Sequence, residues 1–339
     1  MKDNKNYIVV DFEPSSTKAW NGFIDVLKKE TKEDWELYGT RIKNEKFHSI
    51  GRYIHYFVLS WKLFLQRDRI TNIIAVQQFY GLIFAFYCRL FHVKKITNVM
   101  VLSFIYNSKG GIVGKIYRKF IRFIVSGKYV DKLIVHSEHE VSYYSEILGI
   151  DESKLEFCLL GITNDTDKYQ TKKLEELENF FILSVGNSNR DFDFIEECLR
   201  GEEYPVKIYS DNVEESVNKN IFYSKGISVS QYYEQLANCF CMVIALRDQN
   251  ISSGQLVLLQ SYAFGKPVII TRTKGCEDYI DESCVITINK NKKELLQMIK
   301  LLQEDREKYN MLCNNAVTIF QQKFSLEAMG RRLVKVLLD

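Results

Sequence analysis

Two polar loops hold the residues of this chain best suited to bind an anion. The first loop is Gly186-Asn187-Ser188-Asn189-Arg190, and the second is Ser252-Ser253-Gly254-Gln255. An arginine guanidinium pairs with phosphate oxygens through a planar fork of N–H donors. A helix that begins after Gly254 would add backbone N–H groups at its positive end. The two loops together therefore predict a phosphate-binding site.

Both loops are expected where a strand ends and a helix begins. The apolar run 181–185 predicts a strand before the first loop. Apolar residues at helical spacing predict a helix over 255–264, and the β-branched run 268–271 is typical of a buried parallel strand. Because parallel strands end at one edge of a sheet, a single ligand would meet both loops. The alternative is an ordinary αβ unit, in which Ser-Gly only caps the helix and Gly-Lys-Pro only ends it.

The segment 250–279, NISSGQLVLLQSYAFGKPVIITRTKGCEDY, resembles the donor-binding signature of GT-B glycosyltransferases, in particular the GT4-like group. In that family two glutamates separated by seven residues precede Gly-x-Pro, and their places fall here on Ser252 and Gln260. Both acids are absent, although the Gln260 amide can still hydrogen-bond ribose hydroxyls. The donor-binding residues that the resemblance implies are Gly186, Asn187, Ser188, Arg190, Ser252, Ser253, Gly254, Gln255 and Gln260. Ile227 follows a predicted strand at the same edge, where its backbone could hold the nucleobase or form a plain turn.

Candidate catalytic groups lie at the ends of predicted strands in the first half of the chain. Asp11 and Glu13 follow the first strand, and His136 follows a later one. A carboxylate or an imidazole at such a place could deprotonate an acceptor hydroxyl. The alternatives are that Asp11 or Glu13 complements a helix dipole and that His136 is a histidine at the edge of the core.

The spacing of Asp191 and Asp193 matches the Asp-x-Asp metal motif of an unrelated fold. Two acids at the start of a helix more simply complement the helix dipole. We therefore expect no metal and no other cofactor, and the resemblance implies a nucleotide sugar as co-substrate.

The order of apolar runs predicts an α/β protein, because strand-like and amphipathic segments alternate along the chain. With the resemblance, this implies two doubly wound Rossmann-like domains facing a cleft. We expect an acceptor-binding domain over 1–162, a linker over 163–178, a nucleotide-sugar-binding domain over 179–322 and a helix over 323–339 that crosses back to the first domain. Strands are predicted at 7–12, 35–38, 73–76, 97–104, 132–136 and 155–160, then at 181–185, 206–209, 222–223, 239–246, 268–271 and 285–288.

Positive charge is concentrated in the first half of the chain. Residues 1–150 have a net charge of +9, residues 151–339 have −6, and no acid occurs between Asp68 and Asp131. At helical spacing, the cations Lys115, Arg118, Lys119 and Arg122 share one face, and Ile116, Phe120 and Phe123 share another, which is expected to be core. The pattern favours an anionic membrane surface. A solvated basic face is the alternative, and no recognisable module supports nucleic acid.

Composition is that of a globular protein, with 46% hydrophobic and 26% charged residues among 339. The sequence has no apolar run near the ~18 residues that span a bilayer, and its N-terminus does not resemble a signal peptide. Eight cysteines without a Cys-x-x-Cys pair are expected to be reduced core residues. We therefore expect a cytoplasmic protein, peripheral on the inner face of the cell membrane.

The function implied is transfer of a sugar from a UDP- or GDP-linked donor to a hydroxyl of a saccharide acceptor, expected to be lipid-linked, in polysaccharide or glycoconjugate synthesis. Two alternatives stay open. One is another nucleotide-sugar enzyme of similar fold, of the epimerase or phosphorylase type. The other is a two-lobed protein that binds a small ligand.

Overall fold

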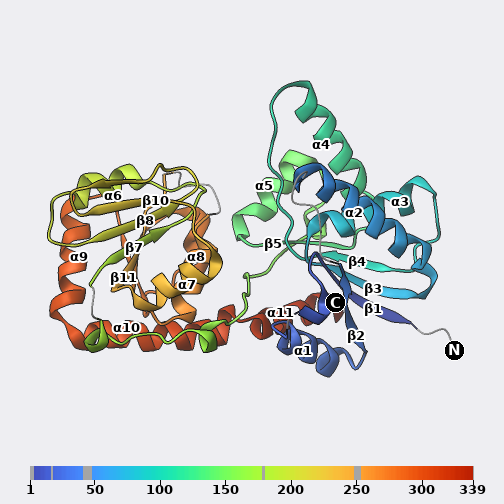
Figure 1. The fold of residues 1–339 in the computed structure, drawn as a ribbon. Coiled ribbons are helices and arrows are strands. Elements are labelled where there is room, and N and C mark those ends of the chain that lie inside the picture. The colour runs from blue at the N-terminus through green and yellow to red at the C-terminus, as the bar shows by residue number, and fades with distance from the viewer. Residues whose placement is uncertain (1–3, 17, 41–47, 178–179, 248–252, 339) are drawn as a thin grey trace. The chain divides into compact units, whose positions relative to one another are not determined.

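A computed structural model describes residues 4–16, 18–40, 48–177, 180–247 and 253–338 of the chain (Figure 1). The chain divides into two compact units. The N-terminal unit consists of Met1–Cys158 and Met329–Asp339, and the C-terminal unit is Leu159–Ala328. The first break lies slightly before the expected domain end at residue 162. The last helix, α11 (Leu326–Leu338), begins in one unit and ends in the other.

The N-terminal unit is built on a parallel six-stranded sheet in the order β2-β1-β3-β4-β5-β6. Its strands are β1 (Lys5–Val10), β2 (Trp35–Gly39), β3 (Ile70–Ala75), β4 (Asn98–Val101), β5 (Lys132–Val135) and β6 (Leu155–Phe157). Its helices are α1 (Asn21–Thr31), α2 (His48–Leu65), α3 (Gln78–Leu90), α4 (Gly111–Val125) and α5 (Glu138–Leu148).

Helices cover both faces of this sheet, because the strand order reverses between β1 and β3. Right-handed crossovers place α2, α3, α4 and α5 on one face and α1 on the other. The end of α11 packs on α1, where a side chain added at Gly330 would meet Phe23 and Val26 at 3.3–3.5 Å. The central strands β1, β3, β4 and β5 contain β-branched residues and are mostly buried, as is usual for a parallel sheet, whereas the edge strands β2 and β6 contain none and are partly exposed.

The C-terminal unit contains a seven-stranded sheet in the order β13-β12-β11-β7-β8-β10-β9. Its strands are β7 (Ile182–Val185), β8 (Val206–Ser210), β9 (Ser216–Asn218), β10 (Ile221–Lys225), β11 (Cys241–Ile244), β12 (Val268–Thr271) and β13 (Val285–Ile288). Its helices are α6 (Phe192–Leu199), α7 (Val229–Asn238), α8 (Gln255–Ala263), α9 (Lys292–Glu304) and α10 (Arg306–Ile319).

This second sheet is also doubly wound. From β7 the chain proceeds to β8 and β10, and from β11 it proceeds in the opposite direction to β12 and β13. One hydrophobic core lies under α7 and α8, and a second lies under α6 and α9. Because β7 and β11 are adjacent and parallel, the strand order reverses between them. Ligands of such sheets bind outside the carboxyl ends of the strands at this switch point.

The predicted α/β class is confirmed, and most elements lie within a few residues of their expected places. One strand was missed, since β9 has three residues and pairs antiparallel with β10 only. The strand predicted over 97–104 ends at Val101, because the chain bends at Leu102 and Ser103. The expectation that Ile116 and Phe123 are core is wrong: they are 63% and 41% exposed.

All eight cysteines are free thiols, and seven of them are buried, as expected. None of the helices that the structure describes has the length and apolar character needed to cross a bilayer.

Candidate functional site

The two predicted phosphate loops meet at the switch point of the C-terminal unit. The first loop follows β7 and the second follows β11, and the two strands are neighbours. Asn189 Nδ2 donates a hydrogen bond to Ser253 Oγ at 3.0 Å, which joins the loops directly. The backbone N–H of Arg247 also donates to the carbonyl of Asn189 at 3.1 Å. A ligand at this edge of the sheet would therefore contact both loops.

The second loop leads into α8 through a glycine in the left-handed conformation. Gly254 is the N-cap, with φ +90°, and no side chain caps the helix. The first N–H groups of α8 therefore lack a side-chain acceptor from the cap residue, as an anion-binding helix end requires. Gln255 Nε2 donates to the carbonyl of Gly275 at 2.9 Å, and buried Ser253 accepts a hydrogen bond from Cys276 at its carbonyl. Ser252 lies outside the described residues.

Arg190 is half-buried and stabilises the first loop through two hydrogen bonds to backbone carbonyls. Its Nε donates to the carbonyl of Val185 at 2.9 Å, and one terminal nitrogen donates to the carbonyl of Ser188 at 2.9 Å. Gly186, at φ +134°, makes room for the guanidinium, because a Cβ there would lie 2.5 Å from it. Burial lowers the pKa of Arg190 from its ordinary value, because a partly desolvated guanidinium holds its charge less favourably than one in water. Two of its five N–H donors serve the loop.

Asn187 ties the first loop to the end of β8. Its side-chain oxygen accepts from Ser210 Oγ at 3.0 Å and from the backbone N–H of Asp211 at 2.7 Å. Its amide nitrogen donates to the Asp211 carboxylate at 2.6 Å. The side chain of Asn187 is thus engaged in holding the first loop to the end of β8, although Asn187 and Ser188 are both exposed.

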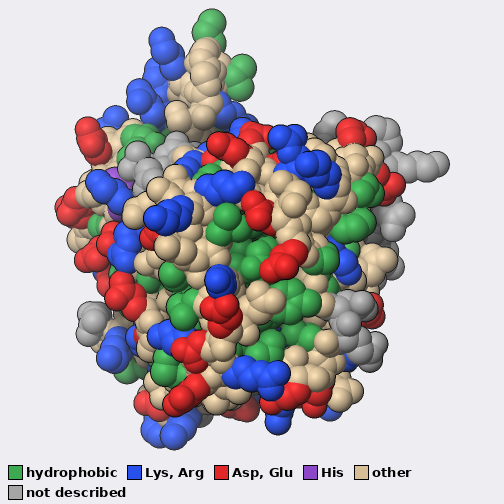
Figure 2. Space-filling view, turned by 90° about the vertical axis from the view of Figure 1, so that its left-hand side faces the viewer, with side chains coloured by type: hydrophobic (Ala, Val, Ile, Leu, Met, Phe, Trp, Pro, Cys, Tyr) green, Lys and Arg blue, Asp and Glu red, His purple; other side chains and the backbone are tan. Residues whose placement is uncertain are grey.

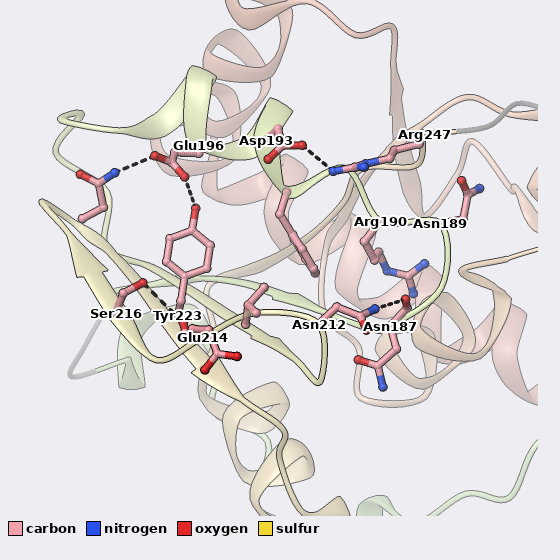
Figure 3. A pocket seen from close by; sticks show the side chains of 13 residues that line it. Asn187, Asn189, Arg190, Asp193, Glu196, Asn212, Glu214, Ser216, Tyr223 and Arg247 are labelled. Carbon is pink, nitrogen blue, oxygen red and sulfur yellow. Dashed lines mark hydrogen bonds and ion pairs between the residues drawn. The ribbon is translucent and has the colours of Figure 1, made fainter.

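A cavity of about 600 Å³ opens beside this loop (Figure 3). Asn187, Asn189 and Arg190 form one side of it, and residues of α6 and of the segment from β8 to β10 form the others. Glu196 of α6 accepts from Tyr223 Oη and from Asn218 Nδ2 across the far wall. Cavities of this size hold small organic ligands. Glu196 and Tyr223 were not predicted from the sequence, because neither lies in a recognisable motif.

Asp191 and Asp193 are engaged in ion pairs. Asp191 caps α6 by accepting from the backbone N–H of Phe194 at 3.2 Å, and it pairs with Lys290 Nζ at 2.5 Å. Asp193 pairs with Arg247 on the rim of the cavity. Across the described residues, no three His, Cys, Asp or Glu side chains gather as they would in a metal site.

Ile227 and Gln260 lie in the same unit. Ile227 follows β10 after Gly226, which has φ +71°, and it is half-buried against the core under α7 and α8. Gln260 lies within α8, where its Nε2 donates to Tyr233 Oη at 3.2 Å. The amide oxygen of Gln260 is left to accept from a ligand hydroxyl, or from Tyr233 if the amide is turned over.

The candidate catalytic residues of the N-terminal unit do not form one cluster. Asp11 and Glu13 are exposed after β1, and His136 follows β5, three strands away in the sheet. At the usual strand spacing of ~4.8 Å this separates them by about 14 Å. At most one of the two places can therefore contact a given acceptor hydroxyl.

His136 is half-buried and forms hydrogen bonds with both ring nitrogens. Nδ1 donates to the carbonyl of Cys158 at 2.8 Å, which leaves Nε2 to accept from Ser103 Oγ at 2.8 Å. Burial lowers the pKa of His136 below 6.5, although the bond to Cys158 opposes this shift. Ser103 was missed from the sequence, since a serine after a strand has no distinctive pattern. His55 was missed as well: it lies on α2, where the charge of Asp11 acts to raise its pKa against a larger effect of burial.

The four cations of α4 are exposed, as the sequence predicts for Lys115, Arg118, Lys119 and Arg122. Arg122 also has a structural role. Its guanidinium lies over Gly149, the C-cap of α5, where a Cβ would meet it at 3.2 Å. A cation at the carboxyl end of a helix complements the helix dipole.

No family profile and no curated protein matches the sequence. Solved structures match over nearly the whole chain. HepE from Anabaena, in complex with UDP and glucose, is 12% identical with a TM-score of 0.60, and the match covers 99% of this chain and 100% of that one.

A glycosyltransferase from Rickettsia africae is 13% identical with a TM-score of 0.63, covering 98% of this chain and 97% of that one. WaaG, a glycosyltransferase of lipopolysaccharide biosynthesis, is 13% identical with a TM-score of 0.60, covering 97% and 98%. The chain contains two doubly wound units, and it matches these structures over nearly its whole length. These findings show that the protein has the GT-B fold of glycosyltransferases.

Proposed function

We propose that the protein is a glycosyltransferase that binds a nucleotide-sugar donor at the switch point of its C-terminal unit. The observation that carries this proposal is the hydrogen bond between Asn189 and Ser253. It places the loop of Arg190 and the amino end of α8 at one sheet edge, where a guanidinium and backbone N–H groups can share one diphosphate. The UDP and UDP-glucose bound in the HepE structures are ligands of the class proposed here.

The chemistry follows from the charge of the leaving group. When the bond between the sugar and the diphosphate breaks, negative charge develops on the phosphate oxygens. Fixed donors that point at this charge stabilise the transition state, because they need no reorganisation. Arg190 and the first N–H groups of α8 can stabilise this charge, and the proposed reaction relies on them rather than on a metal. A UDP- or GDP-linked sugar fits the proposal.

The acceptor is proposed to be a hydroxyl of a saccharide bound by the N-terminal unit. Asp11 or Glu13 after β1, or His136 after β5, would take the proton of that hydroxyl. His136 is suited to this role in its neutral form, since burial lowers its pKa. Its Nε2 reaches the acceptor only through Ser103 or after that hydrogen bond opens.

We further propose that the acceptor is lipid-linked and that the enzyme works at the inner surface of the cell membrane. The exposed cations of α4 would hold the protein to anionic lipid, at about 1 kcal/mol for each. Because such attraction is screened by ions, replacing Lys115 and Lys119 with glutamate should weaken sedimentation with anionic vesicles most at low salt. WaaG acts in lipopolysaccharide biosynthesis, which supports an acceptor of this class without identifying it.

A screen of UDP-, GDP-, ADP- and dTDP-sugars by thermal shift tests the donor, and nucleotide release with and without saccharide acceptors tests the transfer. The proposal expects one nucleotide class to stabilise the protein and free nucleoside diphosphate to appear only when an acceptor is present. Nucleotide release that an added saccharide does not increase would speak against a glycosyltransferase and favour an epimerase- or phosphorylase-type enzyme. Stabilisation by a sugar but by no nucleotide would favour a small-ligand-binding protein.

A further inference from the structure

The hydrophobic side chains exposed on the N-terminal unit are concentrated on two helices. Among the described residues, most of the large hydrophobic side chains that are exposed belong to this unit, and α2 and α4 hold the largest groups. We propose that α2 and α4 together form a bilayer-docking surface that inserts apolar side chains into an anionic phospholipid membrane. This rests on the proposed function, since it specifies how the enzyme would be held at a lipid-linked acceptor.

The outer side of α2 is an apolar face, defined by Tyr53, Ile54, Phe57, Val58, Trp61 and Leu65, all of which are exposed. The spacing of three and four residues places them along one side of the helix. The opposite side is buried in the core of the unit through Tyr56, Leu59 and Leu63, and the ring of Tyr56 contacts Phe79 and Tyr80 of α3. The helix is therefore apolar on both its covered and its exposed sides. A helix in contact only with water would carry polar residues on the exposed side.

The aromatic rings of this face are held in place by α3. Phe57 meets Tyr87 edge-on at 6.3 Å, and Trp61 lies 5.0 Å from Tyr87 and 5.8 Å from Phe91. Contacts with α3 orient the rings and leave more than a third of Phe57 and of Trp61 exposed. Tryptophan and tyrosine with one free side are the residues enriched at the boundary between lipid and water.

The second part of the surface is the first two turns of α4, where Ile112, Val113 and Ile116 are 77%, 71% and 63% exposed. This end of α4 projects beyond the neighbouring helices of its unit (Figure 1), and in Figure 2 the projection at the top carries hydrophobic and Lys or Arg side chains. Three aliphatic side chains at a projecting helix end are placed to enter a lipid layer. The cations Lys115 and Lys119 lie directly beside them on the same helix.

Both parts lie on the same face of the sheet. The crossovers place α2, α3 and α4 side by side there. Contacts between Phe86 of α3 and Phe120 and Phe123 of α4, with ring centres 5.4 and 6.5 Å apart, continue the aromatic layer from α2 to α4. One flat membrane can therefore contact both helices.

The charges of this surface favour an anionic lipid bilayer as its partner over a second copy of the chain. Neither α2 nor α4 contains an aspartate or a glutamate, and the cations Arg52 and Lys62 flank the apolar face of α2. A two-fold dimer would use this same acid-free patch on both copies, so no carboxylate of α2 or α4 would face these cations. An anionic bilayer supplies the negative headgroups for the cations and the acyl chains for the apolar residues.

Insertion of apolar side chains should make vesicle binding partly resistant to salt, which attraction by the basic face alone would not do. Charge attraction fades as salt rises from about 0.1 M to about 1 M, because the Debye length falls from ~10 Å to ~3 Å. Burial of apolar side chains does not depend on this screening. Binding to anionic vesicles should therefore retain a salt-resistant part, supplied by α2 and the end of α4.

Trp61 provides a direct probe of insertion. The full-length protein is mixed with vesicles of phosphatidylcholine and phosphatidylglycerol whose acyl chains are brominated, and tryptophan fluorescence is measured. Trp35 is buried, and Trp20 is half-buried beside α1 on the other face of the sheet, so quenching should come from Trp61 and should be lost in Trp61→Phe. Quenching that persists unchanged in Trp61→Phe, or no quenching of the bound protein, would overturn the proposal.

Substitutions test the same surface without relying on fluorescence. Phe57→Ser and Ile116→Ser should each weaken vesicle binding at high salt by about tenfold or more, which is the effect of losing one inserted apolar side chain. Phe222→Ser removes a comparably exposed phenylalanine from β10 and should leave binding unchanged. Circular dichroism and the melting temperature check that each variant is folded. Equal binding by all three variants would refute the surface.

Two further results separate this inference from others. If sedimentation reveals a dimer that Phe57→Ser dissociates, the face is an interface between copies and the membrane proposal fails. Nucleotide binding is measured by calorimetry in the absence of lipid. Vesicle insertion without nucleotide binding would support the docking surface and refute the proposed donor site. Nucleotide binding without insertion would support the donor site and refute the docking surface.

Discussion

Asn189 Nδ2 lies 3.0 Å from Ser253 Oγ, and this contact joins two loops that are 64 residues apart in the sequence. Each loop follows one of the two adjacent strands between which the strand order reverses. Asn189 has φ +56°, a conformation that asparagine tolerates better than most residues do. The contact therefore fixes where the guanidinium of Arg190 stands relative to the amino end of α8.

Replacing Arg190 with alanine should weaken nucleoside diphosphate binding by about 1.5–3 kcal/mol, because a charge-assisted contact is lost. The variant should also melt earlier, since Arg190 donates to the carbonyls of Val185 and Ser188. Calorimetry and thermal unfolding measure the two effects separately. Arg306→Ala, which removes an exposed arginine from α10, is the control and should change neither. Unchanged nucleotide affinity in folded Arg190→Ala would remove Arg190 from the site.

Gly254→Ala should destabilise the protein by about 1–2 kcal/mol through backbone strain alone. A Cβ at Gly254 has room, with its nearest neighbours at 3.5 Å, but the residue has φ +90°. Relaxation of this strain would turn the first N–H groups of α8 and weaken nucleotide binding. Ser253→Ala is the comparison, since it removes only the hydroxyl that Asn189 contacts. Denaturant unfolding measures the stabilities, and equal stability of Gly254→Ala and the unmodified protein would contradict the strain.

Gln260 is expected to contact the donor ribose. Gln260→Glu should preserve donor binding, and Gln260→Leu should weaken it by about 0.5–1.5 kcal/mol, the usual contribution of one hydrogen bond. Because Gln260 also bonds Tyr233 Oη at 3.2 Å, Tyr233→Phe shows how much of the loss is structural. Normal nucleotide affinity in Gln260→Leu would make Gln260 a residue of the helix only.

Stability should fall as the pH drops below 6.5. Burial lowers the pKa of both His136 and His55 below that ordinary value, so the unfolded chain binds more protons than the folded one in this range. The stability that their neutral forms contribute is complete above pH 6.5 and is lost as the pH falls toward their folded pKa values. Melting temperatures between pH 7.5 and pH 5.5 should show a smaller change in His136→Gln than in the unmodified protein. An identical change in both would show that His136 does not titrate in this way.

The sequence was sufficient to predict the fold class, because buried parallel strands such as Val268–Thr271 are uninterrupted apolar runs. It also located the two loops, since glycine and asparagine mark the places where a strand gives way to a helix. The contact of Asn189 with Ser253 could not be predicted in the same way, because it depends on β7 and β11 being neighbours.

The residues that were missed or misplaced depend on how separate elements are arranged in space, which the local sequence pattern does not determine. Ser103 and His136 are partners only because β4 and β5 pair, and a single serine carries no pattern. Ile116 and Phe123 follow the spacing of a core face, yet both are exposed: Ile116 lies near the projecting amino end of α4, and Phe123 contacts the outer side of α3 through Phe86. Helical periodicity identifies an apolar face but does not say whether protein or another apolar medium covers it.

Calorimetric titration of the unmodified protein and of Arg190→Ala with UDP and with GDP is the sharpest test of the proposed donor site. We expect one of these nucleoside diphosphates to bind with a stoichiometry of one. We also expect Arg190→Ala, still folded, to bind that nucleotide at least tenfold more weakly, which corresponds to about 1.4 kcal/mol. Absence of binding by either nucleotide, or equal affinity in the two proteins, would contradict the donor site proposed at the switch point of the C-terminal unit.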